Sequence, residues 1–130
     1  SNTRILTAVE FMAQAYRYTA SFEYRNFVYD QLNWVLGNNP YDLCLIAGLC
    51  ESDSPPVALP RGFSFADTQG FVLHGIGPHA AEIDTPQFSV ETNNVQENTN
   101  GFSLYNNARY ISAMAYLKRI PVARPLKAAR

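Results

Sequence analysis

The sequence has little net charge, few cysteines and no long apolar run. Its formal net charge is −1 over 130 residues, so the chain has no overall electrostatic field that would attract nucleic acid. No stretch approaches the roughly 18 uninterrupted apolar residues that a membrane span needs, and no signal peptide precedes the first predicted helix. We therefore expect a protein that binds neither nucleic acid nor membrane.

Cysteine is also scarce. The two cysteines, Cys44 and Cys50, have a spacing that fits neither a redox pair nor a zinc knuckle. Cys44 lies inside the apolar run 43–49, which predicts that it packs as a small hydrophobic residue. A local disulfide is the alternative in an oxidising compartment. In either case we predict a structural role.

Charges of opposite sign are separated along the chain. All eleven acidic residues lie at or before Glu97, whereas six basic residues follow it. Lys118 and Arg119 complement the C-terminus of a predicted helix, and no aromatic residue lies among the cations of the tail. We interpret the tail as solvated rather than as a nucleic-acid patch.

Hydrophobic residues make up 47% of the chain, enough for the core of one domain, which we place over residues 1–130. Apolar positions at helical spacing predict a first helix over 4–19 and a second over 24–35, joined by a short connection as an antiparallel hairpin. Gly37 has the character of a residue just past a helix C-terminus, and Pro40 blocks continuation.

A third helix is predicted over 102–119, because Leu104, Ala108, Ile111 and Ala115 share one face. Three further apolar residues, Tyr110, Met114 and Leu117, lie beside that face. Between Gly37 and Gly101 lie all seven glycines and six of the eight prolines. We expect a long irregular segment there, either a functional loop system or a surface covered by other elements.

Four stretches resemble the late part of the catalytic domain of family-nine glycoside hydrolases, cellulases built as a six-hairpin α/α toroid. The stretches are Gln31 to Tyr41 with its Leu-Gly-Asn-Asn-Pro helix end, the apolar Leu45 to Leu49, Pro55-Pro56 followed by Leu59-Pro60-Arg61-Gly62, and Tyr105 to Tyr110. The resemblance spans about 90 residues. It implies an all-α fold: a helical hairpin and a C-terminal helix with a long loop segment, forming the C-terminal portion of an (α/α)6 toroid.

The resemblance also implies site residues. Arg61 matches the arginine of a substrate-binding loop, whose neighbouring histidine is absent here, and a guanidinium can donate hydrogen bonds to sugar hydroxyls. Asn107 matches the asparagine that opens the last helix; we assign it to substrate binding through positioning of the acid-bearing loop. The position expected to hold the catalytic acid is Gly101. Glu97 is therefore the candidate acid, and Glu91 is a weaker one.

One carboxylate does not suffice for this chemistry. An inverting glycosidase needs a carboxylic acid and a second carboxylate about 6.5–9.5 Å away. In this family an Asp pair near the start of the catalytic domain supplies the second one, so we expect these residues to be inactive alone. The resemblance predicts part of a glycoside hydrolase that acts on a polysaccharide or oligosaccharide without a cofactor, and it would be secreted or periplasmic.

The alternative is a non-catalytic helical module that binds carbohydrate or assembles with another subunit. Its partner would be a second copy of the chain or the missing N-terminal part of the same domain. A metal site is less favoured. His74, His79, Glu82 and Asp84 have suitable side chains but no diagnostic spacing, and the glycines among them indicate a turn.

Overall fold

A computed structural model describes residues 1–50, 64–78, 86–88, 99 and 101–118. Within these ranges the main elements are three α-helices, α1 (Asn2–Thr19), α2 (Phe22–Val35) and α3 (Leu104–Lys118). A 3-10 helix, η1 (Phe65–Thr68), and two short antiparallel strands, β1 (Gly77–Pro78) and β2 (Pro86–Gln87), complete the list. The prediction of a mainly helical fold is confirmed. No described helix is long and apolar enough to cross a membrane.

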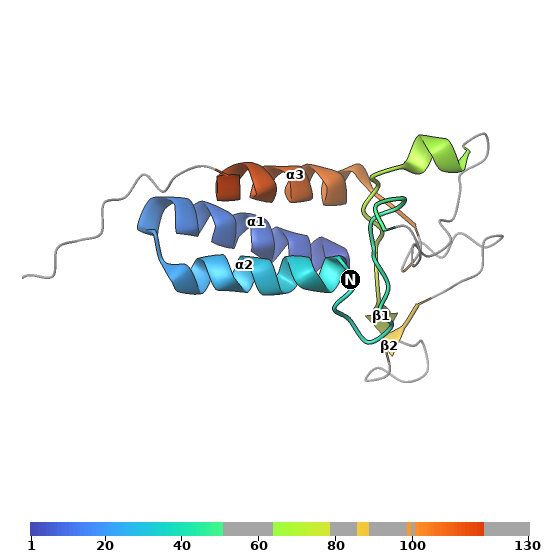
Figure 1. Ribbon diagram of the computed structural model, residues 1–130, viewed down its shortest axis with the longest axis horizontal. Helices are drawn as coiled ribbons and strands as arrows, with labels where there is room; N and C mark the ends of the chain where they lie inside the picture. Colours follow the sequence, from blue (N-terminus) through green and yellow to red (C-terminus); the bar gives the residue numbers. More distant parts are fainter. Residues whose placement is uncertain (51–63, 79–85, 89–98, 100, 119–130) are drawn as a thin grey trace, which may run out of the picture.

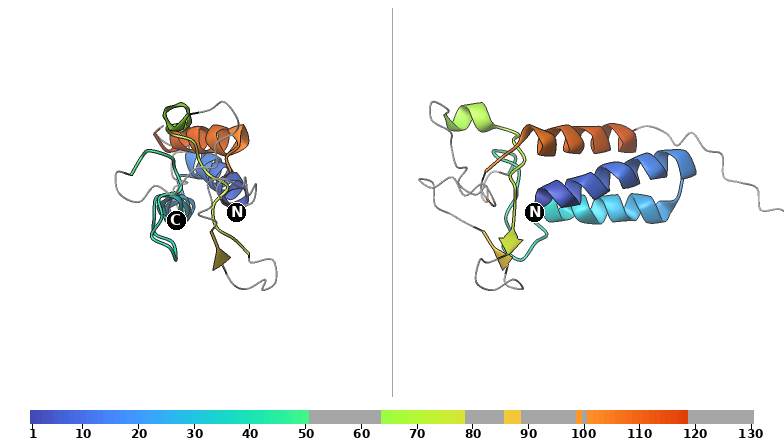
Figure 2. Two further views of the ribbon diagram at one scale, coloured as in Figure 1. Left: turned by 90° about the vertical axis from the view of Figure 1, so that its right-hand side faces the viewer. Right: turned by 180° about the vertical axis from the view of Figure 1, so that it is seen from behind.

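The three helices lie side by side, with α1 between α2 and α3 (Figure 1). Only Ala20 and Ser21 separate α1 from α2, so these helices form the predicted antiparallel hairpin. The view from behind shows the same arrangement (Figure 2). As a result the N-termini of α1 and α3 and the C-terminus of α2 all lie at one end of the helical layer.

Small and branched apolar side chains fill the space between the helices. The buried residues of this core are Val9 and Ala13 of α1, Val28 and Leu32 of α2, and Ala113 of α3. Full burial of a Val or Leu side chain contributes about 1.5–3 kcal/mol. One ion pair, Arg109 to Glu10 at 2.9 Å, also joins α3 to α1. Because both of its side chains are partly exposed, this pair adds at most about 1 kcal/mol.

The α3 face that the sequence marks as apolar points away from this core. Leu104 is 78% exposed and Ile111 is 65% exposed, and Ala108 and Ala115 are exposed as well. The neighbouring apolar residues Tyr110, Met114 and Leu117 pack against the core instead. The side of α3 that faces the core is therefore the side of these neighbouring residues, and Leu104, Ala108, Ile111 and Ala115 form an uncovered stripe.

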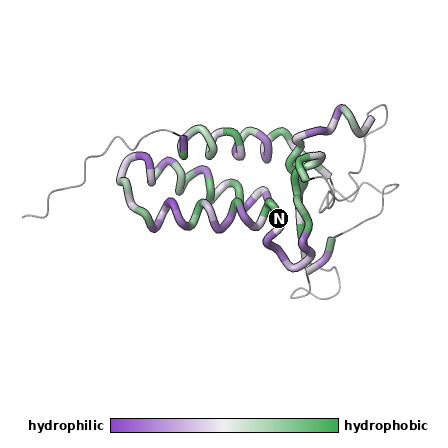
Figure 3. Tube along the Cα trace, viewed as in Figure 1, coloured by the Kyte–Doolittle hydropathy of each residue, from purple (hydrophilic) through white to green (hydrophobic). Residues whose placement is uncertain are grey.

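A small hydrogen-bonded layer, which we call the cap, covers the end of the helices. It consists of residues 44–47, 70–76 and 99–102 without the undescribed residue 100, and its described segments are largely hydrophobic (Figure 3). Backbone bonds from Leu73 N–H to the Leu45 carbonyl (2.9 Å) and from His74 N–H to the Gly101 carbonyl (2.8 Å) join the three segments. The expectation of an irregular segment holds for these residues, which form isolated β-bridges rather than helices or strands, and hydrogen bonds order them into a layer.

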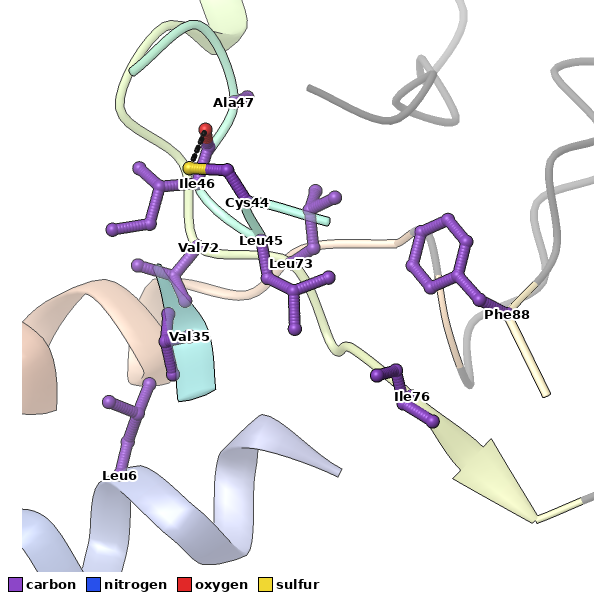
Figure 4. Packing of buried hydrophobic residues seen from close by; sticks show 10 residues of the cluster. All are labelled: Leu6, Val35, Cys44, Leu45, Ile46, Ala47, Val72, Leu73, Ile76 and Phe88. Carbon is purple, nitrogen blue, oxygen red and sulfur yellow. Dashed lines mark hydrogen bonds between the residues drawn. The ribbon is translucent and has the colours of Figure 1, made fainter. Parts of the chain in front are cut away.

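The cap has its own apolar core beside the helix ends. Figure 4 shows Leu6 of α1 and Val35 of α2 next to side chains of the cap such as Leu45, Val72 and Leu73. The rings of Phe71 and Phe102 pack at the edge of this core, with their centroids 4.5 Å apart. The cap is thus continuous with the helices rather than a separate unit.

The Gly-Asn-Asn-Pro stretch turns the chain from α2 into the cap. Gly37 has a φ of 126°, which favours glycine, and Asn38 N–H donates to the Asn33 carbonyl at 2.9 Å, as in a Schellman helix end. Asn39 is buried. Its Nδ2 donates to the carbonyls of Trp34 (2.9 Å) and Leu43 (2.7 Å), and its Oδ1 accepts from Tyr41 N–H. This asparagine therefore fixes the turn.

Cys44 and Cys50 form a disulfide across a sequence separation of 6 residues. Cys44 is also buried in the apolar core of the cap, and Cys50 packs against that core. The alternative of a local disulfide is confirmed, and so is the packing of Cys44 as a small hydrophobic residue.

We predict that Asn39→Ala lowers the free energy of unfolding by about 2–3 kcal/mol, because the partly buried carbonyls of Trp34 and Leu43 lose their donor. Denaturant titration followed by circular dichroism measures this change. Asn38→Ala is the matched control, since the Asn38 side chain is exposed, and it should cost less than about 0.5 kcal/mol. Equal losses for the two variants would contradict the role of Asn39.

Reduction of the disulfide should destabilise the cap by about 2 kcal/mol, which is the loop-closure entropy expected for so short a loop. The measurement is thermal unfolding with and without a thiol reductant. A Cys44→Ala, Cys50→Ala double variant is the control and should not respond to the reductant. A wild-type chain that is equally insensitive would show that the disulfide constrains nothing.

Candidate functional site

Two buried asparagines tie the N-termini of α1 and α3 to the cap. The Leu73 carbonyl accepts hydrogen bonds from Nδ2 of Asn2 at 2.9 Å and from Nδ2 of Asn106 at 3.3 Å. Thr3 donates through its hydroxyl to Oδ1 of Asn106 at 3.0 Å. Asn2 and Asn106 are both 0% exposed. The Leu73 carbonyl in the middle segment of the cap is therefore bonded to both helices.

Gly75 is required where the cap passes Asn2. Its φ is +84°, and a Cβ there would lie 2.6 Å from Cγ of Asn2. The amide orientation of Asn2 follows from its bond to Leu73, because only Nδ2 can donate to a carbonyl. This orientation leaves Oδ1 of Asn2 buried without a hydrogen-bond partner, which costs stability. The close approach of Gly75 to Asn2 thus fixes the position of the cap, and the unpaired Oδ1 of Asn2 is the energetic cost.

Asn107 holds the same segment of the cap from the side of α3. Its Oδ1 accepts from Val72 N–H at 3.1 Å, and its Nδ2 donates to the Gly70 carbonyl at 2.9 Å. The side-chain amide therefore replaces a neighbouring strand for residues 70–72. Its predicted part in substrate binding remains a prediction, and the contact that the structure gives it is with backbone.

The residues just before α3 are attached to the cap by backbone bonds. The Gly101 carbonyl accepts from His74 N–H at 2.8 Å, and the Thr99 carbonyl accepts from Gly75 N–H at 2.8 Å. Gly101, the position at which the family resemblance places an acid, is buried and carries no side chain. Glu97 lies two residues before Thr99 in the sequence.

Several predicted site residues fall outside the described ranges. These are Arg61, Glu97 and Glu91, together with His79, Glu82 and Asp84 of the metal candidate. Of the predicted set, the structure therefore places Asn107, Gly101 and His74, all of which belong to the cap or contact it. Among the described residues no three potential ligands lie close enough to hold a metal ion.

One carboxylate near the cap has a shifted pKa. Asp67 in η1 accepts hydrogen bonds from the hydroxyl of Ser64 (2.6 Å) and from its backbone N–H (2.8 Å). These bonds, the side-chain one first, lower the pKa of Asp67 below its ordinary value. A depressed pKa in the folded state means that the interaction is present above the unfolded pKa and is lost as the pH falls through the folded one. Asp67 thus stays ionised near neutral pH.

Sequence reasoning missed the structural asparagines Asn2, Asn39 and Asn106. Each is buried and bonded to backbone carbonyls. A signal was present for Asn106, which lies on the same side of α3 as Tyr110 and Ala113, where an asparagine needs a specific partner. Asn2 and Asn39 lie at or just after helix ends, where asparagine is common for local reasons, so neither the long-range bond of Asn2 nor the turn bonds of Asn39 could be predicted.

Comparison with known protein families finds none that matches this sequence. No curated protein matches it either.

Asn107→Ala should expose the Val72 amide to solvent exchange, because that N–H loses its acceptor. We expect Val72 exchange to accelerate roughly tenfold or more, in line with the loss of a hydrogen bond worth about 1.5 kcal/mol. Hydrogen exchange followed by NMR gives the rate for each residue. The Leu73 amide is the internal control, since it donates to Leu45 and should remain protected. Unchanged Val72 exchange would contradict the bond.

Proposed function

We propose that the chain is part of a glycoside hydrolase of the cellulase type that acts on a polysaccharide or oligosaccharide. In this proposal the helical hairpin and α3 are part of an α/α toroid that further hairpins complete. Arg61 binds substrate, Glu97 is the general acid, and Asn107 positions the loop that carries the acid. The proposal rests on the sequence resemblance and on the geometry of the cap.

The observation that carries the proposal is that each candidate segment begins at a residue that packs in or against the apolar core of the cap. The segment with Glu97 lies between Phe88, buried in the cap core, and Thr99, bonded to Gly75. The segment with Arg61 begins after Cys50, which the disulfide fastens to Cys44. An active site in a helical fold is commonly built from loops at one end of the helices, and this arrangement supports such a site.

Uncovered apolar side chains support the toroid. Phe11 and Tyr18 on α1 are exposed, as are Phe22 and Tyr29 on α2. An isolated helical hairpin rarely leaves so many large apolar residues in water, and additional packed hairpins would cover them. The second carboxylate of the reaction would also come from those hairpins, because the mechanism needs two.

A non-catalytic module remains the second candidate, and Gly101 favours it. The position that resembles the acid of active relatives is a buried glycine whose carbonyl is engaged with His74. If Glu97 does not act as the acid in place of Gly101, the backbone bonds of Thr99 and Gly101 to the cap remain, but no catalytic acid is present. Such a protein would bind carbohydrate or assemble with a partner rather than cleave glycosidic bonds.

We expect Glu97→Gln to reduce kcat on a soluble β-glucan by roughly 10²–10⁴-fold in the natural gene product that contains these residues, because general acid catalysis is lost. Release of reducing ends measures the rate. Glu91→Gln is the matched control and should retain activity. Arg61→Ala should chiefly raise KM, because it removes donors to the sugar.

Three outcomes would contradict this proposal or parts of it. Full activity of Glu97→Gln with loss in Glu91→Gln would move the acid to Glu91. Absence of turnover in the parent protein, with oligosaccharide binding that Arg61→Ala abolishes, would establish the non-catalytic module. Absence of both turnover and binding would exclude a carbohydrate function.

A further inference from the structure

The uncovered stripe of α3 has the spacing of a helix-docking seam. Leu104, Ala108, Ile111 and Ala115, which we call the α3 seam, recur at intervals of four, three and four residues. This is the interval of the a and d positions through which two helices pack along their length. All four residues are exposed, and α3 lies at the edge of the helical layer, so the seam is open to a second helix (Figure 1).

The seam alternates large and small side chains in a self-complementary way. When two copies of α3 run antiparallel about a two-fold axis at the middle of the seam, Leu104 faces the partner's Ala115. In the same register Ala108 faces the partner's Ile111. A large side chain then meets a small one in every layer, which fills the interface evenly. A two-fold axis makes such contacts reciprocal.

A parallel pairing of the seam is less favourable. It would place Leu104 against the partner's Leu104 and leave the alanines facing each other across gaps. The helix dipoles would also be aligned, whereas an antiparallel pair opposes them. The order of residues in the seam therefore selects the antiparallel arrangement.

The charges of α3 do not oppose self-association. Its charged residues are Arg109, which is bonded to Glu10, and Lys118, which lies beyond the seam at the C-terminus of the helix. The four seam residues are all apolar. No like charges therefore meet within the seam, and no buried ion pair is needed to form it.

We propose that the α3 seam is the interface of an antiparallel dimer of this chain. This inference is independent of the glycoside hydrolase proposal, because it uses only the exposed residues of α3. A single pair of helices buries less than the roughly 1,200 Å² of a standard interface. The dimer should therefore be weak, with a dissociation constant in the micromolar range.

Sedimentation equilibrium of the 130-residue chain over a wide concentration range tests dimer formation. Ile111→Glu places a charge in the seam and should weaken the dimer roughly a hundredfold or more, since an unpaired charge would have to be buried. Phe11→Glu is the matched control, because Phe11 is 60% exposed on α1, outside the seam. This variant should dimerise like the wild type.

Spin labels test the orientation of the two helices. In a Lys118→Cys variant, labelled at the new thiol, an antiparallel dimer separates the two Cα positions by about 26 Å along the helix axis, from the rise of 1.5 Å per residue. A parallel dimer would bring them to roughly 10 Å. A pulsed electron resonance measurement of the longer separation would support the proposal.

Three results would overturn the proposal. The first is a wild-type chain that remains monomeric at millimolar concentration. The second is a dimer that Phe11→Glu disrupts and Ile111→Glu does not. The third is the short label separation of a parallel pair. None of them bears on whether Glu97 is a catalytic acid, so the two proposals fail separately.

Discussion

The Leu73 carbonyl is the point on which the described structure depends. Its two donors come from Asn2 at the start of α1 and Asn106 near the start of α3, so one backbone group locks the cap to two helices. All three residues are buried. In a region of low dielectric constant, a polar group without its partner costs more than the bond contributes, so the three positions are strongly interdependent. The cap and the helices therefore form one cooperative unit.

Asparagine serves this architecture because its side chain can imitate a peptide group. Asn107 presents an acceptor to Val72 N–H and a donor to the Gly70 carbonyl, as a neighbouring strand would. Asn39 does the same at the turn after α2. The cap can thus be built from short segments without a complete sheet, because side-chain amides satisfy the backbone groups that a sheet would pair. The helical layer gains an ordered end with few residues.

Local patterns predicted the helices and their ends well. The 3.6-residue periodicity gave three helices, and Gly37 with Pro40 marked the end of α2, because these signals act within a few residues. The cap was missed because its bonds join residues such as Leu45 and Leu73, which are far apart in the sequence. The inward face of α3 could not be predicted because the helix is apolar on two sides, and periodicity alone does not say which one packs. Asn107 was selected only through a family resemblance, and the structure places it at the cap.

The fixed ends of the segments that enter the cap bear on how such a protein can evolve. When the ends of a loop are already held together, doubling its length costs only about 0.6 kcal/mol in closure entropy. Residues between Cys50 and Ser64, or between Phe88 and Thr99, can therefore change in number and kind while the helices keep their packing. The cap thus allows the sequences of these segments to change at one rate while the helical scaffold changes at another.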